Sequence, residues 1–122
     1  MKKIIIIFMI LFLVGCKSEE VKFKIPSITS SEVNRMLTSN EEFTLIDVRT
    51  KAEYESEHIK DAINIPVEEI ESTTLDKDTK IVVYCQSGNR SAKAAQILIE
   101  NGYGNVYDLG GIIGWTYETE RE

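Results

Sequence analysis

The sequence predicts an α/β fold, with a mainly parallel central sheet flanked by helices, from two observations. Short apolar runs alternate along the chain with stretches that have the composition of helices, and this alternation is typical of βα units. The runs are rich in Ile and Val, as strands buried on both faces of a parallel sheet usually are. Four runs are therefore strand candidates: residues 44–48 (TLIDV), 62–65 (AINI), 80–85 (KIVVYC) and 105–109 (NVYDL).

Two helices are predicted from their N-terminal capping residues. Thr29 is followed three residues later by Glu32, and Thr50 is followed in the same way by Glu53. In such a capping box the hydroxyl of the first residue accepts a hydrogen bond from the backbone of the second, whose carboxylate reaches back. We therefore expect helices to begin just after Thr29 and just after Thr50.

Two further helices are expected in the C-terminal part of the chain. One should begin near Ser91 and stop at Gly102, because glycine suits the left-handed position just past a helix end. Its apolar residues between positions 94 and 98 recur at helical spacing and should face the sheet. A short last helix over residues 112–117 would place Trp115 against the body of the domain.

The N-terminus has the layout of a bacterial secretion signal. Lys2 and Lys3 precede an unbroken apolar run, residues 4–14, which is shorter than the about 20 residues that span a bilayer as a helix. The ending LVGC, residues 13–16, resembles the lipobox of bacterial lipoproteins, which implies cleavage after Gly15 and a diacylglyceryl group on the sulfur of Cys16. The alternatives are a plain cleaved signal or an uncleaved anchor, with Cys16 incidental.

This interpretation divides the chain into three parts. Residues 1–15 are the lipoprotein signal peptide, residues 16–26 are the lipidated cysteine and a polar tether, and residues 27–122 are one globular domain. We therefore expect an extracytoplasmic, monomeric lipoprotein, anchored to a membrane of the bacterial cell envelope through the lipid on Cys16.

The composition argues against two classes of function. The chain has 14 Lys and Arg against 20 Asp and Glu, so it lacks the clustered basic residues that nucleic-acid binding requires. It has one histidine, and lipidation of Cys16 leaves one free cysteine, so no transition-metal site is visible. We expect no nucleic-acid partner, no metal and no cofactor.

The segment that most suggests chemistry is CQSGNRS, residues 85–91, because Cys85 ends a predicted strand at the edge where α/β sheets bind ligands. The small polar residues after Cys85 favour a tight turn whose backbone N–H groups point inward as an anion-binding nest. The next helix adds the positive end of its dipole, and Arg90 adds a cation, so the pocket favours the thiolate of Cys85. The alternative is a buried structural cysteine.

Three segments resemble those of the rhodanese-like sulfurtransferases in their small single-domain form. The first is CQSGNRS, with an arginine five positions after the cysteine. The second is LIDVRTKAEYESEHIKDAINIP, residues 45–66, and the third is VYDLGGIIGW, residues 106–115, with a glycine pair and a tryptophan. Together they extend over nearly all of residues 28–117, and on this resemblance the chain is identified as a member of the family, with the rhodanese-like fold.

The resemblance implies an enzyme that carries sulfane sulfur as a persulfide on Cys85. Such an enzyme takes the sulfur from thiosulfate or a persulfide and passes it to a thiol or to cyanide. Arg90 would orient the donor, and the loop would cradle the persulfide and the donor's oxygens through Gln86, Ser87, Gly88, Asn89 and Ser91. Asp47 and Arg49 would support the loop from the neighbouring strand, and a purely structural ion pair is the alternative for these two.

One stretch departs from the family. Where the family usually has small, turn-forming residues around its His-Ile pair, this chain has Glu57 before His58 and then Lys60 and Asp61, and we expect a surface turn there. His58 is a candidate general base, but the family does not use this histidine as a base, and a structural hydrogen bond is the favoured role.

Two other functions compete with sulfur transfer. Phosphatases and arsenate reductases of the same fold also place a cysteine and an arginine around an oxyanion, but their loop is one residue longer, to hold a phosphoryl group. The other competitor is a non-catalytic rhodanese-like binding module at the cell envelope. Domains with that role often lack the cysteine, which this chain retains as Cys85.

Overall fold

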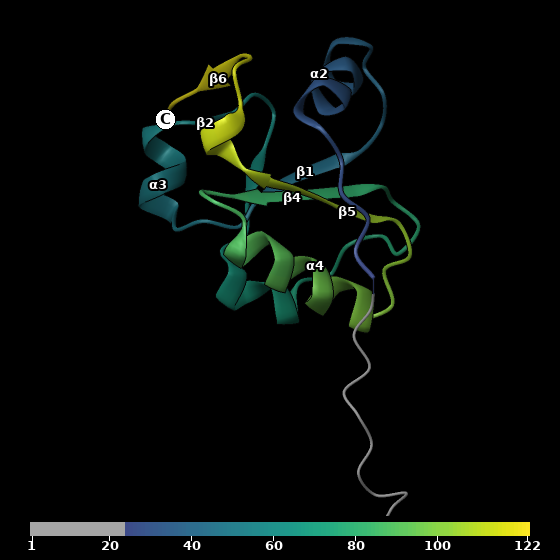
Figure 1. Cartoon of the computed structure of the whole chain (residues 1–122). Helices are drawn as coiled ribbons and strands as arrows, with labels where there is room; N and C mark the ends of the chain where they lie inside the picture. The colour runs from purple at the N-terminus through teal and green to yellow at the C-terminus, as the bar shows by residue number, and fades with distance from the viewer. Residues whose placement is uncertain (1–23) are drawn as a thin grey trace, which may run out of the picture.

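Four parallel strands form the central sheet, as the sequence predicts (Figure 1). The computed structural model describes residues 24–122. The strands lie in the order β3-β1-β4-β5, and each overlaps one of the four predicted runs. Their bounds are Ile63–Asn64 (β3), Thr44–Asp47 (β1), Ile81–Cys85 (β4) and Val106–Gly111 (β5).

Helices cover both faces of this sheet, which confirms the predicted layers (Figure 1). Helix α4 (Asn89–Glu100) and the 3-10 helix η1 (Val67–Ser72) pack on one face, and α2 (Ser30–Thr38) packs on the other. Helix α3 (Lys51–Ser56) follows β1 and lies near the C-terminus of the chain (Figure 1). The core is therefore divided by the sheet into two apolar clusters.

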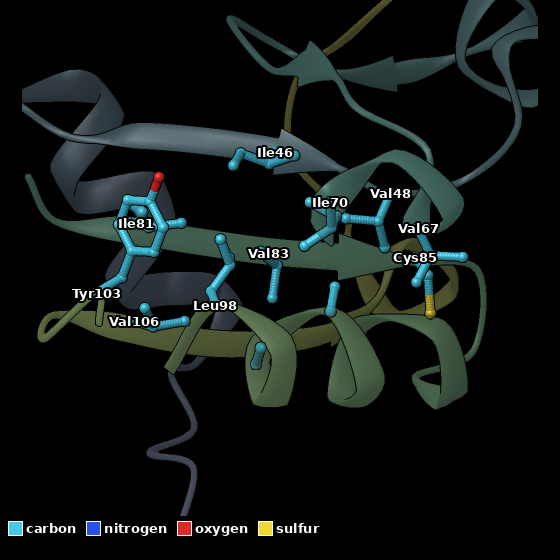
Figure 2. Packing of buried hydrophobic residues seen from close by; sticks show 12 residues of the cluster. Ile46, Val48, Val67, Ile70, Ile81, Val83, Cys85, Leu98, Tyr103 and Val106 are labelled. Atoms are coloured by element: carbon cyan, nitrogen blue, oxygen red, sulfur yellow. The ribbon is translucent and has the colours of Figure 1, made fainter. Parts of the chain in front are cut away.

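Alternate residues of β4 contribute to the two clusters. Ile81, Val83 and Cys85 belong to the cluster under α4, whereas Val82 and Tyr84 belong to the cluster under α2. Figure 2 shows the first cluster, with Cys85 at the carboxyl end of β4. The period of two along this strand places the cysteine on the same side of the sheet as α4.

The first two helices begin where their capping residues predict. Thr50 forms a complete capping box with Glu53 at the start of α3. At the start of α2 the hydroxyl of Thr29 accepts a hydrogen bond from the backbone N–H of Glu32, at 3.2 Å. The Glu32 carboxylate, however, pairs with Arg35 at 2.6 Å, so the contacts show only one half of that capping box.

The prediction of the last two helices is correct for the first of them. Helix α4 begins at Asn89, two positions before Ser91, after Gly88 in the left-handed region at φ +113°, and Gly102 lies just past its end at φ +98°, as predicted. The helix predicted over residues 112–117 is wrong, since only one 3-10 turn, Ile112–Gly114, forms there. Trp115 is nevertheless 8% exposed and packs in the α2-side cluster, as expected.

A second, two-stranded sheet is absent from the prediction. It pairs β2 (His58–Ile59) with β6 (Thr119–Glu120) in antiparallel fashion. The surface turn expected around His58 is therefore wrong at that residue, which is 1% exposed, and the turn begins at Lys60. Strands of two residues depend on a distant partner and carry too few side chains for a period to be recognised.

The segment before α2 runs along the edge strand β5. Ser27 forms a parallel bridge with Asp108, whose N–H donates to the Pro26 carbonyl at 2.9 Å and whose carbonyl accepts from Ile28 at 3.1 Å. The predicted signal peptide and Cys16 lie outside the described residues. Within residues 24–122, no helix has the length and apolar character needed to cross a bilayer.

Candidate active site

The loop after β4 curls around the sulfur of Cys85. The backbone N–H of Gly88 donates to Cys85 Sγ at 3.0 Å, and the sulfur lies beside the first turn of α4 (Figure 2). Gly88 has a φ of +113°, which glycine adopts without the strain that a side chain would bring. Cys85 itself is 1% exposed, while Gln86, Ser87 and Asn89 around it are exposed.

These surroundings favour the thiolate. Burial raises the pKa of the Cys85 thiol, but hydrogen bonds from the backbone and the hydroxyl of Ser91 and from the backbone of Gly88 and Ser87 outweigh it, so that the pKa is lower than usual. The positive end of α4 acts in the same direction. The backbone N–H groups thus supply most of the stabilising contacts, as expected for an anion-binding nest, and the Ser91 hydroxyl adds to them.

The glycine pair that ends β5 leaves room for the loop. A Cβ on Gly111 would lie 2.4 Å from the carbonyl oxygen of Gln86, so a larger residue would displace the loop. The hydroxyl of Ser91 lies 3.1 Å from the carbonyl oxygen of Gly88 and 3.3 Å from that of Gly110. Strand β5 therefore supports the loop by close backbone approach.

Asp47 and Arg49 form a buried ion pair next to the loop. Arg49 Nη2 lies 2.7 Å from Asp47 Oδ2, and the two side chains are 5% and 0% exposed. Arg49 also donates to the carbonyl of Glu57 at 2.6 Å and to Oε1 of Gln86 at 3.3 Å, and Asp47 accepts the hydroxyl of Tyr84 at 2.8 Å. The pair therefore links the end of β1 to residue 57 and to the first residue of the loop.

Arg90 has a partner that the sequence analysis did not assign to the site. Its Nη1 and Nη2 donate to Oε1 and Oε2 of Glu53, at 2.8 and 3.1 Å. The two side chains are 34% and 33% exposed, and their contact joins the first turns of α4 and α3. Hydrogen bonding to Arg90 lowers the pKa of Glu53 to about 2, so the carboxylate is ionised at neutral pH.

His58 is held by contacts with α3 and β6. Its Nδ1 lies 2.7 Å from the carbonyl oxygen of Tyr54, its ring stacks on that of Tyr54 with centroids 3.8 Å apart, and its Nε2 lies 3.6 Å from Glu120 Oε1. These contacts match the structural hydrogen-bonding role favoured from the sequence. Among residues 24–122, no group of three or more His, Cys, Asp or Glu side chains could hold a metal ion.

Comparison with known proteins assigns the family. The model of the rhodanese-like domain matches residues 29–118. The chain belongs to the rhodanese-like domain family. It is 40% identical over 91 residues to a sulfurtransferase of Allochromatium vinosum, a match that covers 72% of this chain and 85% of that protein.

Two further rhodanese-like relatives come from Escherichia coli. A thiosulfate sulfurtransferase of strain K12 is 41% identical over 71 residues, which cover 55% of this chain and 68% of that protein. A solved structure described as a rhodanese with anions is 35% identical with a TM-score of 0.60, covering 65% of this chain and 98% of that one. The fold and the sulfurtransferase family therefore agree with the resemblance in the sequence.

Sequence reasoning missed two contributors to this rhodanese-like site. Glu53 was noted only as a capping residue, and the close approach of Gly111 to the loop was not foreseen. Both residues lie in segments that carry the family resemblance, Glu53 in residues 45–66 and Gly111 in the glycine pair. Their place in these segments is the sequence signal by which both residues could have been identified as part of the site.

Proposed function

We propose that this rhodanese-like protein transfers sulfane sulfur from thiosulfate or a persulfide, through a persulfide on Cys85, to a thiol or cyanide. The observation that carries the proposal is the loop around Cys85, where a backbone N–H donates to the sulfur at 3.0 Å beside a helix N-terminus. A cysteine that only filled the core would gain nothing from this arrangement. The lowered pKa of the thiol supports the same role, because the thiolate is the nucleophile.

The reaction needs no redox partner. The Cys85 thiolate attacks the outer sulfur of thiosulfate, a new S–S bond forms, and the electron pair of the old S–S bond leaves with sulfite. Cyanide or a thiolate then attacks the outer sulfur of the persulfide, and the electron pair of that S–S bond returns to Cys85 as the thiolate. Thiocyanate or a new persulfide is released.

The loop and Arg90 would bind the donor during this reaction. The negative charge of the sulfur donor would be bound by hydrogen bonds from the backbone N–H groups of residues 86–91 and from the guanidinium N–H groups that do not contact Glu53. The related E. coli structure is described as a rhodanese with anions, which supports anion binding as a property of such a domain. The four residues between Cys85 and Arg90 favour sulfur transfer over a phosphatase or arsenate reductase, whose loop is longer.

The test is a sulfur-transfer assay on the full-length protein, with thiosulfate or a low-molecular-weight persulfide as donor and cyanide as acceptor. Mass spectrometry after thiosulfate alone should show Cys85 heavier by one sulfur atom, and cyanide should remove the added mass. Cys85→Ser should lose all transfer, because the sulfur of Cys85 is itself bonded to the transferred atom. Absence of both the adduct and transfer in the wild type would favour the non-catalytic binding module.

We also propose that the protein is held at the cell envelope by a lipid on Cys16, on the strength of the LVGC ending of the apolar run. Labelled fatty acid fed to cells should enter the wild-type protein and be absent from Cys16→Ser. Equal labelling of the two proteins would contradict the lipid anchor.

A further inference from the structure

Glu53 and Arg90 are joined by two hydrogen bonds between their charged groups. Both terminal nitrogens of the guanidinium donate to the two carboxylate oxygens, at 2.8 and 3.1 Å. The partners are separated by 37 positions in the chain and lie in the first turns of α3 and α4. Bidentate pairs of this kind fix the plane and position of a guanidinium.

Glu53 is held in place independently of Arg90. Its Oε1 also accepts hydrogen bonds from the backbone N–H of Thr50 at 2.9 Å and from the Thr50 hydroxyl at 3.0 Å. These are the contacts of the capping box that starts α3. The carboxylate is therefore a fixed point to which Arg90 is attached, and not a mobile counter-ion.

Arg90 is in electrostatic contact with the reactive sulfur as well. The hydrogen bonds to Glu53 raise the pKa of Arg90, and the negative charge of Cys85 adds to that shift. The contact with Glu53 uses two of the five guanidinium N–H groups, so three stay available to a donor molecule. The positive charge that those three groups would offer is, however, offset by the adjacent carboxylate.

We propose that Glu53 is a positioning residue which, through its pair with Arg90, sets the charge of the donor that the site prefers. This inference rests on the proposed sulfurtransferase function and narrows its substrate class. An isolated arginine would favour a dianion such as thiosulfate, whereas a guanidinium paired with a carboxylate carries no net charge. The preferred donors are then monoanions, such as organic thiosulfonates and persulfides.

Two donors that differ in charge but share their reaction test the inference. Thiosulfate is a dianion, and methanethiosulfonate is a monoanion that gives up its outer sulfur to the thiolate and leaves as methanesulfinate. Removal of one negative charge near the donor should help the dianion more than the monoanion. In Glu53→Gln, the ratio of kcat/KM for thiosulfate to that for methanethiosulfonate should rise by about three- to tenfold at low ionic strength.

The controls separate this effect from folding and from net charge. Gln is also accepted at the third position of a capping box, so Glu53→Gln keeps the start of α3. Glu55→Gln removes the same charge from another side of α3, where Glu55 faces Lys51 at 3.9 Å. This control should leave the ratio within about twofold of the wild type.

Each outcome decides the matter. A rise in the ratio confined to Glu53→Gln supports the inference. An unchanged ratio overturns it, and so does an equal rise in Glu55→Gln, which would assign the effect to overall charge. If the wild type transfers sulfur from neither donor, nor from a low-molecular-weight persulfide, the proposed function itself is rejected, and this inference with it.

Discussion

Two ion pairs lie next to the loop of Cys85, and they differ in environment far more than in chemistry. Asp47 and Arg49 are almost fully buried, at 0% and 5% exposure, while Glu53 and Arg90 are about one-third exposed. The guanidinium of Arg49 donates hydrogen bonds to protein groups from three segments of the chain. Arg90 contacts one carboxylate and keeps further donors available.

The difference in burial implies that one pair contributes mainly to stability and the other mainly to activity. A buried charge must be paired inside the protein, and Asp47 and Arg49 accordingly bind mainly to protein groups and hold chain segments together. A pair that is about one-third exposed contributes little to stability, because water competes for both partners, but the remaining N–H groups of Arg90 can contact an incoming anion. We therefore expect loss of stability from the first pair and loss of activity from the second.

The largest effect is expected from Asp47→Ala. This change leaves the Arg49 guanidinium buried without its counter-charge and the Tyr84 hydroxyl without its acceptor, so the free energy of unfolding should fall by about 3–5 kcal/mol. Urea denaturation measures it, with Lys51→Ala, which breaks an exposed contact of 3.9 Å, as the control. A loss no larger than that of the control would mean that burial does not distinguish the two pairs.

Arg90→Ala should have the opposite effect to Asp47→Ala, with a large loss of activity and little loss of stability. Loss of the orienting cation is expected to lower kcat/KM with thiosulfate by about 10² to 10³, equivalent to roughly 2–4 kcal/mol, and to affect methanethiosulfonate less. The free energy of unfolding should change by only about 0–1 kcal/mol, because the pair with Glu53 is exposed. Steady-state kinetics with both donors, together with urea denaturation of the same variant, measure the two quantities. A variant that loses stability and keeps its activity would contradict the assignment.

The smallest effect is the pH dependence of the exposed pair. The pKa of Glu53 is lowered in the folded state from 4.5 to about 2, so its contribution to stability is complete above about pH 4.5 and is lost as the pH falls toward 2. The Tm of the wild type should exceed that of Glu53→Gln slightly at pH 6, and the two should converge at pH 2. Thermal unfolding followed by circular dichroism tests this, and a difference that persists at pH 2 would rule out the carboxylate charge as its source.

The elements that the sequence predicts correctly are those with local signals. The apolar composition of Ile81–Cys85 predicts a strand, and this strand is buried on both faces. The capping residues Thr50 and Glu53, three positions apart, predict the start of α3. β2 and β6 were missed because each has two residues and forms only by pairing with the other, about sixty positions away along the chain. The expected helix over residues 112–117 failed at Gly114, where the single 3-10 turn ends.

The same distinction holds for the site. The turn residues of the loop allowed the nest around Cys85 to be predicted, since Gly88 is three positions from the sulfur it contacts. The partner of Arg90 could not be predicted in this way, because Glu53 reaches it only after two βα units have packed side by side. A pattern of residue types identifies a reactive group, whereas the neighbours that tune it come from topology.

The parallel pairing of residues 26–28 with β5 gives the domain a direction. The segment around Ser27 pairs with β5 at Asp108 and runs in the same direction as that strand, so the chain enters from the end of the sheet where the strands begin. Cys85 and Gly111 lie at the opposite end, where β4 and β5 stop (Figure 1). Residue 24 therefore lies toward the end of the sheet opposite the thiolate, so a link to the lipid proposed on Cys16 would start at that end. An attachment there would leave the edge that carries Cys85 free of the point at which the link joins the domain.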